Sequence, residues 1–358
     1  MREVRTPPRR WRARLAAVAV TAGLFTAVTG VTAPGLTARA PAKTRPPRVA
    51  DIGKFAVGMK TATYVDSTRP TEGVSSSRSM FTAIYYPTQG PSSAQPVQNA
   101  PPDTKDGPYP LILFSHGLGA RGVSYQDIIK TWASAGYIVA APDYPLSNQR
   151  APGGPSFGRA IADTKNQPAD ASFVIDKVID ADKQGKQLGG IDAQRIGAAG
   201  HSLGGITTYG LAFSSCCRDK RIRAAIPMSG LAGVVEGPEN YFRNPTPLLG
   251  LHGNADGTVP YQAGRNAYTS AQPPKFLLTF LGAGHVSPFL AGDNPQAIAL
   301  KKATVDFWNR YIKGDSQALA KLRTDASVPG STTLEEQTGG GTPTRTPAST
   351  SANNRTRG

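Results

Sequence analysis

The pentapeptide Gly200-His201-Ser202-Leu203-Gly204 is the feature of this 358-residue sequence that most restricts its fold. The run RIGAAG leads into it and predicts a short buried strand, and the segment HSLGGITTYGLAF that follows has a helix-like pattern. A serine in a tight turn between a strand and a helix, flanked by glycines at this spacing, is typical of a nucleophile elbow, because the glycines avoid clashes where strand and helix meet. Ser202 is therefore a candidate nucleophile.

Strand-like and helix-like segments alternate along the chain on both sides of this turn. Strands are predicted at SMFTAIYYP, YPLILFSHG and YIVAAPDYP before it and at IRAAIPMSG, TPLLGLHG and KFLLTFLG after it. Helical spacing of apolar residues appears in SYQDIIKTWASAG, NQPADASFVIDKVIDAD and NPQAIALKKATVDFWNRYIKG. The alternation predicts an α/β fold with a mostly parallel central sheet and helices on both faces, which is the order of elements of an α/β-hydrolase. No segment is long enough to suggest a large cap domain between the strands that follow Ser202.

The two ends of the chain are expected to lie outside this domain. Residues 1–42 combine an Arg-rich start, an apolar run and small residues before a cleavage point after Ala42, which predicts a secretory signal peptide. An uncleaved membrane anchor is the alternative. Residues 43–54 are expected to be a linker, residues 55–324 the hydrolase domain, and residues 325–358 a disordered tail rich in Thr, Ser, Gly and Pro. We therefore expect a protein that is secreted or held at the cell envelope.

Charge and cysteine content restrict the partners. The formal net charge is +16, of which +10 remains without residues 1–42, which hold seven Arg and one Glu. Such a charge favours loose association with an anionic cell envelope or reflects a basic composition without a partner. No nucleic-acid-binding motif is present, and the sequence leaves the oligomeric state open. The adjacent Cys216 and Cys217 form neither a disulfide framework nor a metal site. They are expected near a helix end as small apolar residues.

The sequence offers four histidines as a possible base for Ser202. His285, in LGAGHVSPF, comes directly after the last predicted parallel strand, in a glycine-rich loop on the expected catalytic edge. His116 precedes the serine, His201 lies inside the elbow with its side chain expected to point away from the hydroxyl, and His252 lies at a strand end. Those three are interpreted as hydrogen-bonded structural histidines, so His285 is the expected base.

The expected acid is Asp256 in LHGNADGTVPY, which follows the strand before the histidine strand. Asp143, in AAPDYP, is the competitor because it also ends a strand, but it precedes the serine. Only Asp256 keeps the order Ser202, Asp256, His285 that an α/β-hydrolase requires.

Two backbone N–H groups are expected to form the oxyanion hole. Leu203 follows the nucleophile, and Leu118 lies between two glycines in the loop SHGLGA. Leu118, Leu203 and Phe289 are also expected to give the site an apolar lining, with PLSNQRAPGGPSFGRA as a wall on one side.

Five segments, YPLILFSHGLGA, SAGYIVAAPDYP, RIGAAGHSLGG, TPLLGLHGNADGTVPY and GAGHVSPF, occur in this order. Together they resemble the secreted esterase branch of the α/β-hydrolases, which includes dienelactone-hydrolase-like proteins, platelet-activating-factor acetylhydrolases and bacterial polyester-degrading cutinases. The resemblance implies esterase chemistry without a cofactor or metal. The acetylhydrolases place the acid where this chain has Ser229, whereas an acid at Asp256 resembles the other two groups. The polyester-degrading relatives carry an aromatic residue in place of Leu118.

These observations favour a serine carboxylic-ester hydrolase that acts through an acyl-enzyme on Ser202. Its expected substrates are acyl esters, lipid esters or polyesters. An envelope acyltransferase with the same three residues, or an inactive α/β-hydrolase that serves as a binding module, are the alternatives.

Overall fold

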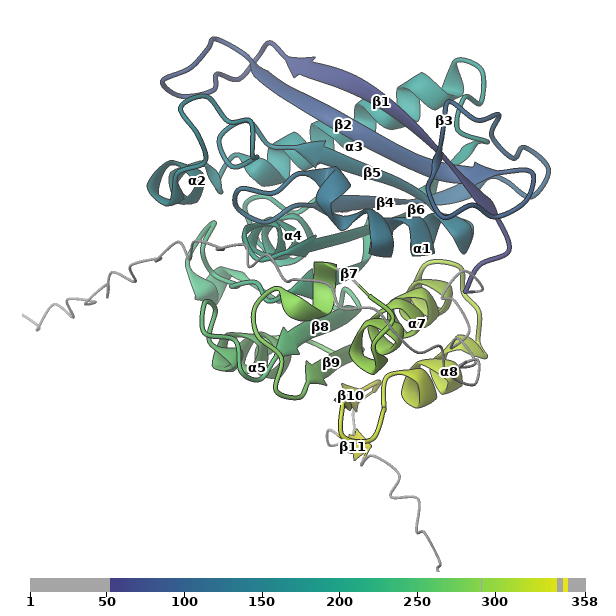
Figure 1. Cartoon of the computed structure of the whole chain (residues 1–358). Helices are drawn as coiled ribbons and strands as arrows, with labels where there is room; N and C mark the ends of the chain where they lie inside the picture. The colour runs from purple at the N-terminus through teal and green to yellow at the C-terminus, as the bar shows by residue number, and fades with distance from the viewer. Residues whose placement is uncertain (1–51, 291, 340–343, 347–358) are drawn as a thin grey trace, which may run out of the picture. The chain divides into compact units, whose positions relative to one another are not determined.

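The computed structural model describes residues 52–290 and 292–339, together with the backbone of residues 344–346 (Figure 1). The expected signal peptide, residues 1–42, and the expected linker up to residue 51 lie outside the described residues.

The described residues form one mixed sheet in the order β11-β10-β9-β8-β7-β6-β4-β5-β2-β1-β3. The six central strands, from β9 across to β5, are parallel to one another, and β2 and β10 are added antiparallel on either side. The strands are β1 (Ala56–Asp66), β2 (Arg78–Thr88), β3 (Val97–Gln98), β4 (Tyr109–Ser115), β5 (Ile138–Asp143), β6 (Ile191–His201), β7 (Ile222–Met228), β8 (Leu248–Gly253), β9 (Lys275–Phe280), β10 (Thr332–Gln337) and β11 (Thr344–Thr346).

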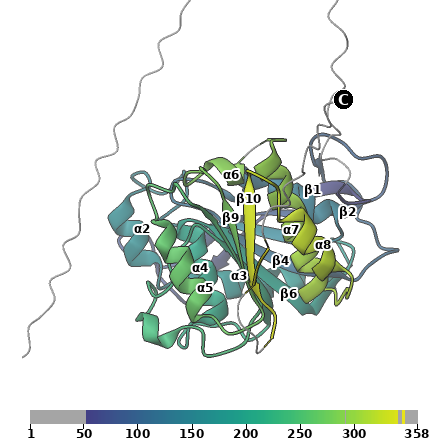
Figure 2. The same ribbon diagram turned by 90° about the horizontal axis from the view of Figure 1, so that it is seen from below.

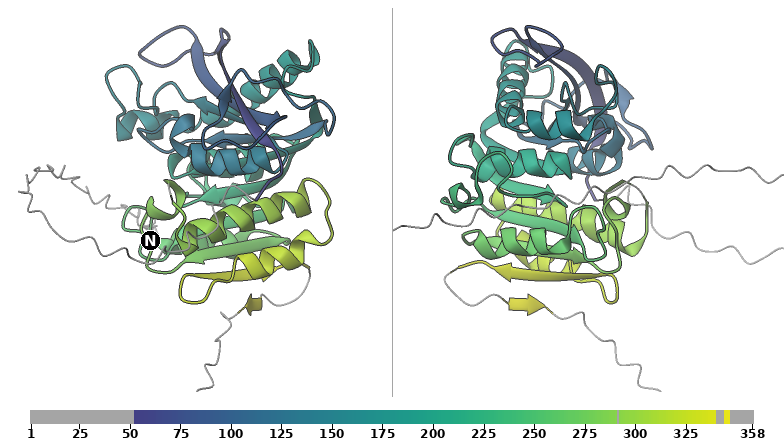
Figure 3. Two further views of the ribbon diagram at one scale, coloured as in Figure 1. Left: turned by 45° about the vertical axis from the view of Figure 1, so that its right-hand side comes forward. Right: turned by 90° about the vertical axis from the view of Figure 1, so that its left-hand side faces the viewer.

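Helices cover both faces of the sheet, as expected for parallel strands that are apolar on both sides. Figure 2 shows α7 and α8 on one side of the sheet and α4 and α5 on the other, and Figure 3 shows the same layers from two further directions. The helices are α1 (Gln126–Ser134), α2 (Phe157–Asp163), α3 (Gln167–Lys183), α4 (Leu203–Phe213), α5 (Tyr261–Ser270), α6 (Ser287–Leu290), α7 (Pro295–Tyr311) and α8 (Ala318–Asp325), with short 3-10 helices η2 (Gly122–Tyr125) and η3 (Pro238–Asn240).

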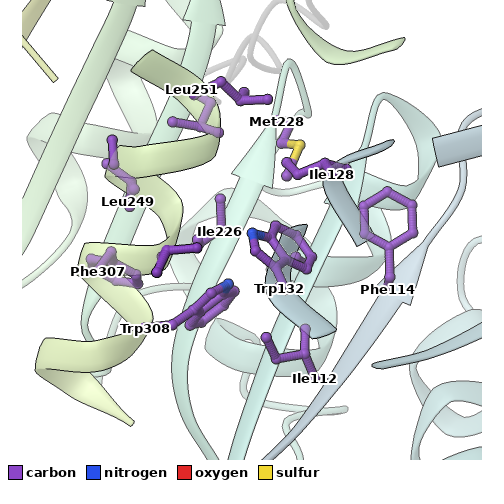
Figure 4. Close-up of a cluster of buried hydrophobic side chains, with 14 of the residues drawn as sticks. Ile112, Phe114, Ile128, Trp132, Ile226, Met228, Leu249, Leu251, Phe307 and Trp308 are labelled. Atoms are coloured by element: carbon purple, nitrogen blue, oxygen red, sulfur yellow. The ribbon is translucent and has the colours of Figure 1, made fainter. Parts of the chain in front are cut away.

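The core beneath α1 and α7 is built around two tryptophans (Figure 4). Trp132 of α1 and Trp308 of α7 meet edge to face with ring centroids 5.8 Å apart, and the Trp132 indole N–H donates to Thr304 over 2.9 Å. Both rings are fully buried, and each such ring removes roughly 150–250 Å² from water. This contact fixes α1 and α7 against the same face of the sheet.

Local signals in the sequence explain where α1 ends and where α7 begins. Gly136, just beyond α1, has φ +85°, a left-handed conformation that glycine adopts without strain. Asn294 precedes α7 and its side chain accepts a hydrogen bond from the Ala297 N–H, with Pro295 at the first helical position.

The expected domain end at residue 324 is wrong. Helix α8 continues to Asp325, and β10 pairs antiparallel with β9 in a register that runs from Thr332 opposite Phe280 to Gln337 opposite Lys275. Leu334 is fully buried in the core. The polar composition of this segment predicts disorder, but the segment forms a strand because its backbone hydrogen-bonds to the edge of β9. Residues 340–343 and 347–358 of the expected tail lie outside the described residues.

The expected state of the two cysteines is also corrected. Cys216 and Cys217 do follow the end of α4 at Phe213, but they are bonded to each other as a disulfide. The turn after α4 brings the two sulfur atoms together, which the spacing of the residues in the sequence does not reveal.

Candidate active site

Ser202 lies between the last residue of β6 and the first residue of α4. Its backbone has φ +57° and ψ −117°, a conformation that residues other than glycine rarely adopt and that persists where the surrounding structure enforces it. The Ser202 N–H donates to the Met228 carbonyl oxygen of the neighbouring strand β7 over 2.8 Å. The turn thereby directs the hydroxyl away from the chain at the carboxyl edge of the sheet.

The two glycines of the elbow are required by the close approach of three backbone segments. A Cβ on Gly204 would lie 2.0 Å from the Ser115 carbonyl oxygen at the end of β4. A Cβ on Gly200 would lie 2.4 Å from the Gly204 carbonyl oxygen. No side chain fits at either position, so the spacing Gly-x-Ser-x-Gly follows from the packing of β4, β6 and α4.

The structure brings Ser202, His285 and Asp256 together in one chain of hydrogen bonds. The Nε2 atom of His285 lies 2.8 Å from the Ser202 hydroxyl oxygen, and Nδ1 lies 2.7 Å from Asp256 Oδ2. Because a carboxylate only accepts, Nδ1 carries the proton and Nε2 is left as an acceptor for the hydroxyl. Loops after β6, β8 and β9 contribute the three residues, and parallel strands end at the same edge of the sheet.

The Asp256 carboxylate is held in its ionised form. Burial alone would raise its pKa, but the hydrogen bond from His285 and two backbone N–H donors outweigh burial, and the net pKa lies below the ordinary value. The backbone donors are Val259 and Thr258, each 2.8 Å from Oδ1. With both oxygens engaged, the carboxylate has a fixed orientation toward the imidazole.

The two candidate oxyanion donors have N–H groups without a hydrogen-bond partner in the part of the chain that the structure describes. Leu203 is the first residue of α4, where a helix leaves its N–H groups unpaired. Leu118 lies in the turn after β4, and its two glycine neighbours are tied down on either side. The Gly117 N–H donates to the Tyr125 hydroxyl over 3.2 Å, and the Gly119 N–H donates to the Ser147 carbonyl over 2.8 Å.

The other three histidines are buried and hydrogen-bonded, as the sequence predicts. His116 Nδ1 donates to the Gly117 carbonyl over 2.8 Å, and Nε2 accepts the Tyr144 N–H over 3.0 Å, which braces the loop of Leu118. His252 Nε2 donates to the Val259 carbonyl over 2.9 Å. Burial lowers the pKa of both imidazoles, so both are neutral.

His201 has a supporting role that the sequence did not indicate. Its Nε2 lies 2.8 Å from the backbone carbonyl oxygen of His285, and its Nδ1 lies 2.8 Å from the Tyr125 hydroxyl. Burial lowers its pKa to about 3, so the ring is a neutral brace beneath the loop of His285. The position of His201 next to Ser202 was the only signal in the sequence for this role. The contact itself could not be predicted, because the partner atom is the backbone carbonyl oxygen of a residue distant in the sequence.

The competing acid, Asp143, has other partners. Its Oδ2 accepts from Arg121 Nε over 2.6 Å, and its Oδ1 accepts from the Gly122 N–H over 2.9 Å. Ser229 has φ +44°, and its buried hydroxyl lacks a hydrogen-bond partner among the described residues.

The apolar lining differs from the expectation. Phe289 is 2% exposed and its ring packs on that of His201 at 4.9 Å, so it supports the histidine loop from below and does not line the site. Leu203 is also buried, against Ala160 and Ile206. Exposed apolar side chains instead lie on segments that follow the parallel strands: Leu118, Leu231 and Val286 on loops, Phe157 at the start of α2 and Leu290 at the end of α6.

Among the residues that the structure describes, no cluster of three His, Cys, Asp or Glu side chains is arranged to hold a metal ion. No helix in that part of the chain is long and apolar enough to cross a membrane.

The fold and this site define an α/β-hydrolase. The sequence model of the family described as chlorophyllase matches residues 75–254, half of the chain. The chain therefore belongs to the chlorophyllase family. The matched region contains Ser202 and ends before Asp256 and His285.

Three individual proteins are also similar to this chain. A Yersinia pestis protein assigned as a carboxymethylenebutenolidase is 23% identical over 239 residues, which cover 63% of this chain and 84% of the relative. The platelet-activating factor acetylhydrolase of Bos taurus is 29% identical over 178 residues, only 39% of its length and 39% of this chain. The solved structure of a ferulic acid esterase from Streptomyces cinnamoneus shares the fold, with a TM-score of 0.55 and 22% identity over 77% of this chain and 93% of that one.

The resemblance to dienelactone-hydrolase-like and acetylhydrolase-like esterases is confirmed, as is the fold class. Family and relatives together identify the chain as an enzyme of the carboxylic ester hydrolase class.

Proposed function

We propose that the protein hydrolyses carboxylic esters through an acyl-enzyme on Ser202, with His285 as general base and Asp256 as the group that orients the imidazole. The observation that supports this most strongly is the unbroken hydrogen-bond chain from the Ser202 hydroxyl through both ring nitrogens of His285 to Asp256. A hydroxyl is a weak nucleophile until such a base accepts its proton.

In the proposed first step, the Ser202 oxygen attacks the ester carbonyl carbon while His285 Nε2 takes the hydroxyl proton. The N–H groups of Leu118 and Leu203 then stabilise the negative charge on the carbonyl oxygen. Collapse of this intermediate breaks the bond to the alcohol, which leaves with the proton from the imidazolium. In the second step, a water molecule transfers a proton to His285 and attacks the acyl carbon. The acid is then released, and the serine oxygen regains its proton from the imidazolium.

We propose that the substrates are esters with an extended hydrophobic part, as in acyl esters, lipid esters or polyesters. The exposed apolar side chains on the loops and short helices around the carboxyl edge favour such groups over small polar esters. Within the described residues, the connection from β7 to β8 carries only the short helix η3, so no inserted cap covers that side. This geometry supports a site that a bulky or surface-bound ester can approach.

Export is a second part of the proposal. The Arg-rich start, apolar run and small residues of the first 42 positions support a signal peptide. These positions hold seven Arg and one Glu, so their removal lowers the net charge from +16 to +10, which still supports loose association with an anionic envelope.

A chain-length series of p-nitrophenyl esters, assayed beside a phospholipid and a polyester film, tests the proposed substrate class. We expect kcat/KM to rise with acyl length, and products analysed with and without an added alcohol should contain the free acid in both cases. An acyl-alcohol product that replaces the acid would instead favour an acyltransferase. A preference for acetyl over all longer chains would contradict the proposed hydrophobic substrates.

A further inference from the structure

A cavity of about 310 Å³ opens at the same edge of the sheet as Ser202 but farther along it. Strand β2, the loop after β4 and the loop after β5 wall it, through residues that include Phe81, Arg121, Asp143, Asn148 and Arg150. The proposed ester chemistry uses none of these side chains.

The position of this cavity follows from the strand order. Phe81 of β2 pairs with Asp143 at the end of β5, and β4 lies between β5 and β6. The two strands that border the cavity, β5 and β2, therefore lie two and three strand spacings from β6, which carries Ser202, or roughly 10 and 14 Å. The two loops that wall the cavity are hydrogen-bonded to each other, since the Gln149 N–H donates to the Ala120 carbonyl over 3.1 Å.

Arg121 places a fixed guanidinium group at the wall of the cavity. It is only 11% exposed, its Nε donates to Asp143 over 2.6 Å, and its guanidinium carbon lies 5.0 Å from the centre of the Phe81 ring. These contacts fix the plane of the guanidinium. Its two terminal nitrogens, Nη1 and Nη2, have no hydrogen-bond partner among the described residues. Arg121 is thus a buried, rigid fork with unused donors beside an open cavity, and such a fork matches the geometry of a carboxylate or phosphate.

The charges that line the cavity have the sign that an anion requires. Arg121 and Arg150 contribute two positive charges, and Asp143 contributes one negative charge. Both oxygens of Asp143 are already occupied, by Arg121 and by the Gly122 N–H. The wall therefore has a formal charge of +1 and an excess of donors. Hydroxyl groups from Ser77 and Ser79 line the same cavity.

We propose that this cavity is an anion-binding site that receives a carboxylate or phosphate-type group on the Arg121 fork, with Arg150 as the second cationic partner. The anion is either free in solution or a charged group at the far end of an ester substrate. The site is separate from Ser202, and the proposal does not depend on the role of that serine.

The test is a calorimetric titration of the full-length protein with inorganic phosphate and with acetate, before and after treatment with an organophosphonate. We expect saturable binding of one anion per chain in both samples. Arg150→Gln should raise the dissociation constant about tenfold or more, as expected for the loss of one charge-assisted hydrogen bond. Arg121→Lys keeps the charge, loses the fork and should weaken binding similarly. Arg223→Gln, which changes an exposed arginine of β7 outside the cavity, is the matched control and should leave binding unchanged.

A second arm distinguishes the two sources of the anion. It compares p-nitrophenyl esters of a fatty acid and of the dicarboxylic acid of equal chain length. A lower KM for the charged ester that disappears in Arg150→Gln identifies a substrate group, whereas equal KM values with retained phosphate binding identify a free anion. The proposal is overturned if neither phosphate nor acetate binds saturably. It is also overturned if phosphonate treatment abolishes binding while both arginine variants leave it unchanged, because the anion would then occupy the Leu118 and Leu203 donors. Failure of the proposed ester chemistry would be visible separately, as full activity in Ser202→Ala.

Discussion

The buried carboxyl group of Asp306 on α7 should make the free energy of unfolding depend on pH, by an amount that follows from its pKa in the folded protein. Its side chain lies in the core with 7% exposure, and its Oδ2 has no hydrogen-bond partner among the described residues. Burial, and then the nearby carboxylate of Asp325 on α8, raise its pKa from 3.8 to about 7. The native state therefore holds a proton that the unfolded chain releases. This stabilisation is complete below about pH 4 and is lost as the pH rises through about 7, and the difference in pKa corresponds to on the order of 4 kcal/mol.

The perturbation is Asp306→Asn, which keeps a donor toward Asp325 but does not ionise. The assay is urea unfolding of the wild-type protein and the variant at several values from about pH 4 to about pH 8. We expect the free energy of unfolding of the variant to gain on that of the wild type as the pH rises, by up to about 4 kcal/mol. Asp180→Asn, which changes an exposed carboxylate on α3, should show no such trend. A difference between Asp306→Asn and wild type that is independent of pH would refute the reasoning, because Asp306 would then ionise normally in the folded protein.

Three further predictions concern the site and the N-terminus. Asp256→Asn should lower kcat by on the order of 10⁴, since an amide stabilises the wrong imidazole tautomer, whereas Asp143→Asn should cost far less in the same assay; the reverse ranking would place the acid before the serine. His285→Ala should leave almost no turnover of a p-nitrophenyl ester, whereas His116→Ala, which loses only a support of the Leu118 loop, should retain much more; the reverse ranking in two variants with native circular dichroism spectra would contradict the assignment. Mass spectrometry of the exported protein should find a mature N-terminus near Lys43, and detection of only the full-length chain in the cytoplasm would contradict export.

The arrangement of the site was predictable because a parallel sheet converts sequence order into spatial proximity. Loops that follow β6, β8 and β9 all emerge at one edge, so a serine, an aspartate and a histidine directly after those strands must approach one another. The glycine spacing around Ser202 added the local turn. The distances and the tautomer, by contrast, required the structure.

The features that sequence reasoning missed depend on contacts between distant segments. Strand β10 has little apolar content, and only the free edge of β9 makes it a strand. Phe289 is apolar and close to His285 in the sequence, but the ring of His201 covers it, and the direction of a side chain in a one-turn helix such as α6 cannot be inferred from composition. The fixed orientation of the Arg121 guanidinium likewise depends on Asp143 of β5 and Phe81 of β2, which are distant from it in the sequence.

Labelling with an organophosphonate probe tests the central claim, a nucleophilic Ser202, most directly. The account predicts a single phosphonate adduct on the Ser202 peptide in tandem mass spectra, complete loss of esterase activity in step with labelling, and neither adduct nor turnover in Ser202→Ala. An adduct on a different residue, or full activity in Ser202→Ala, would contradict it.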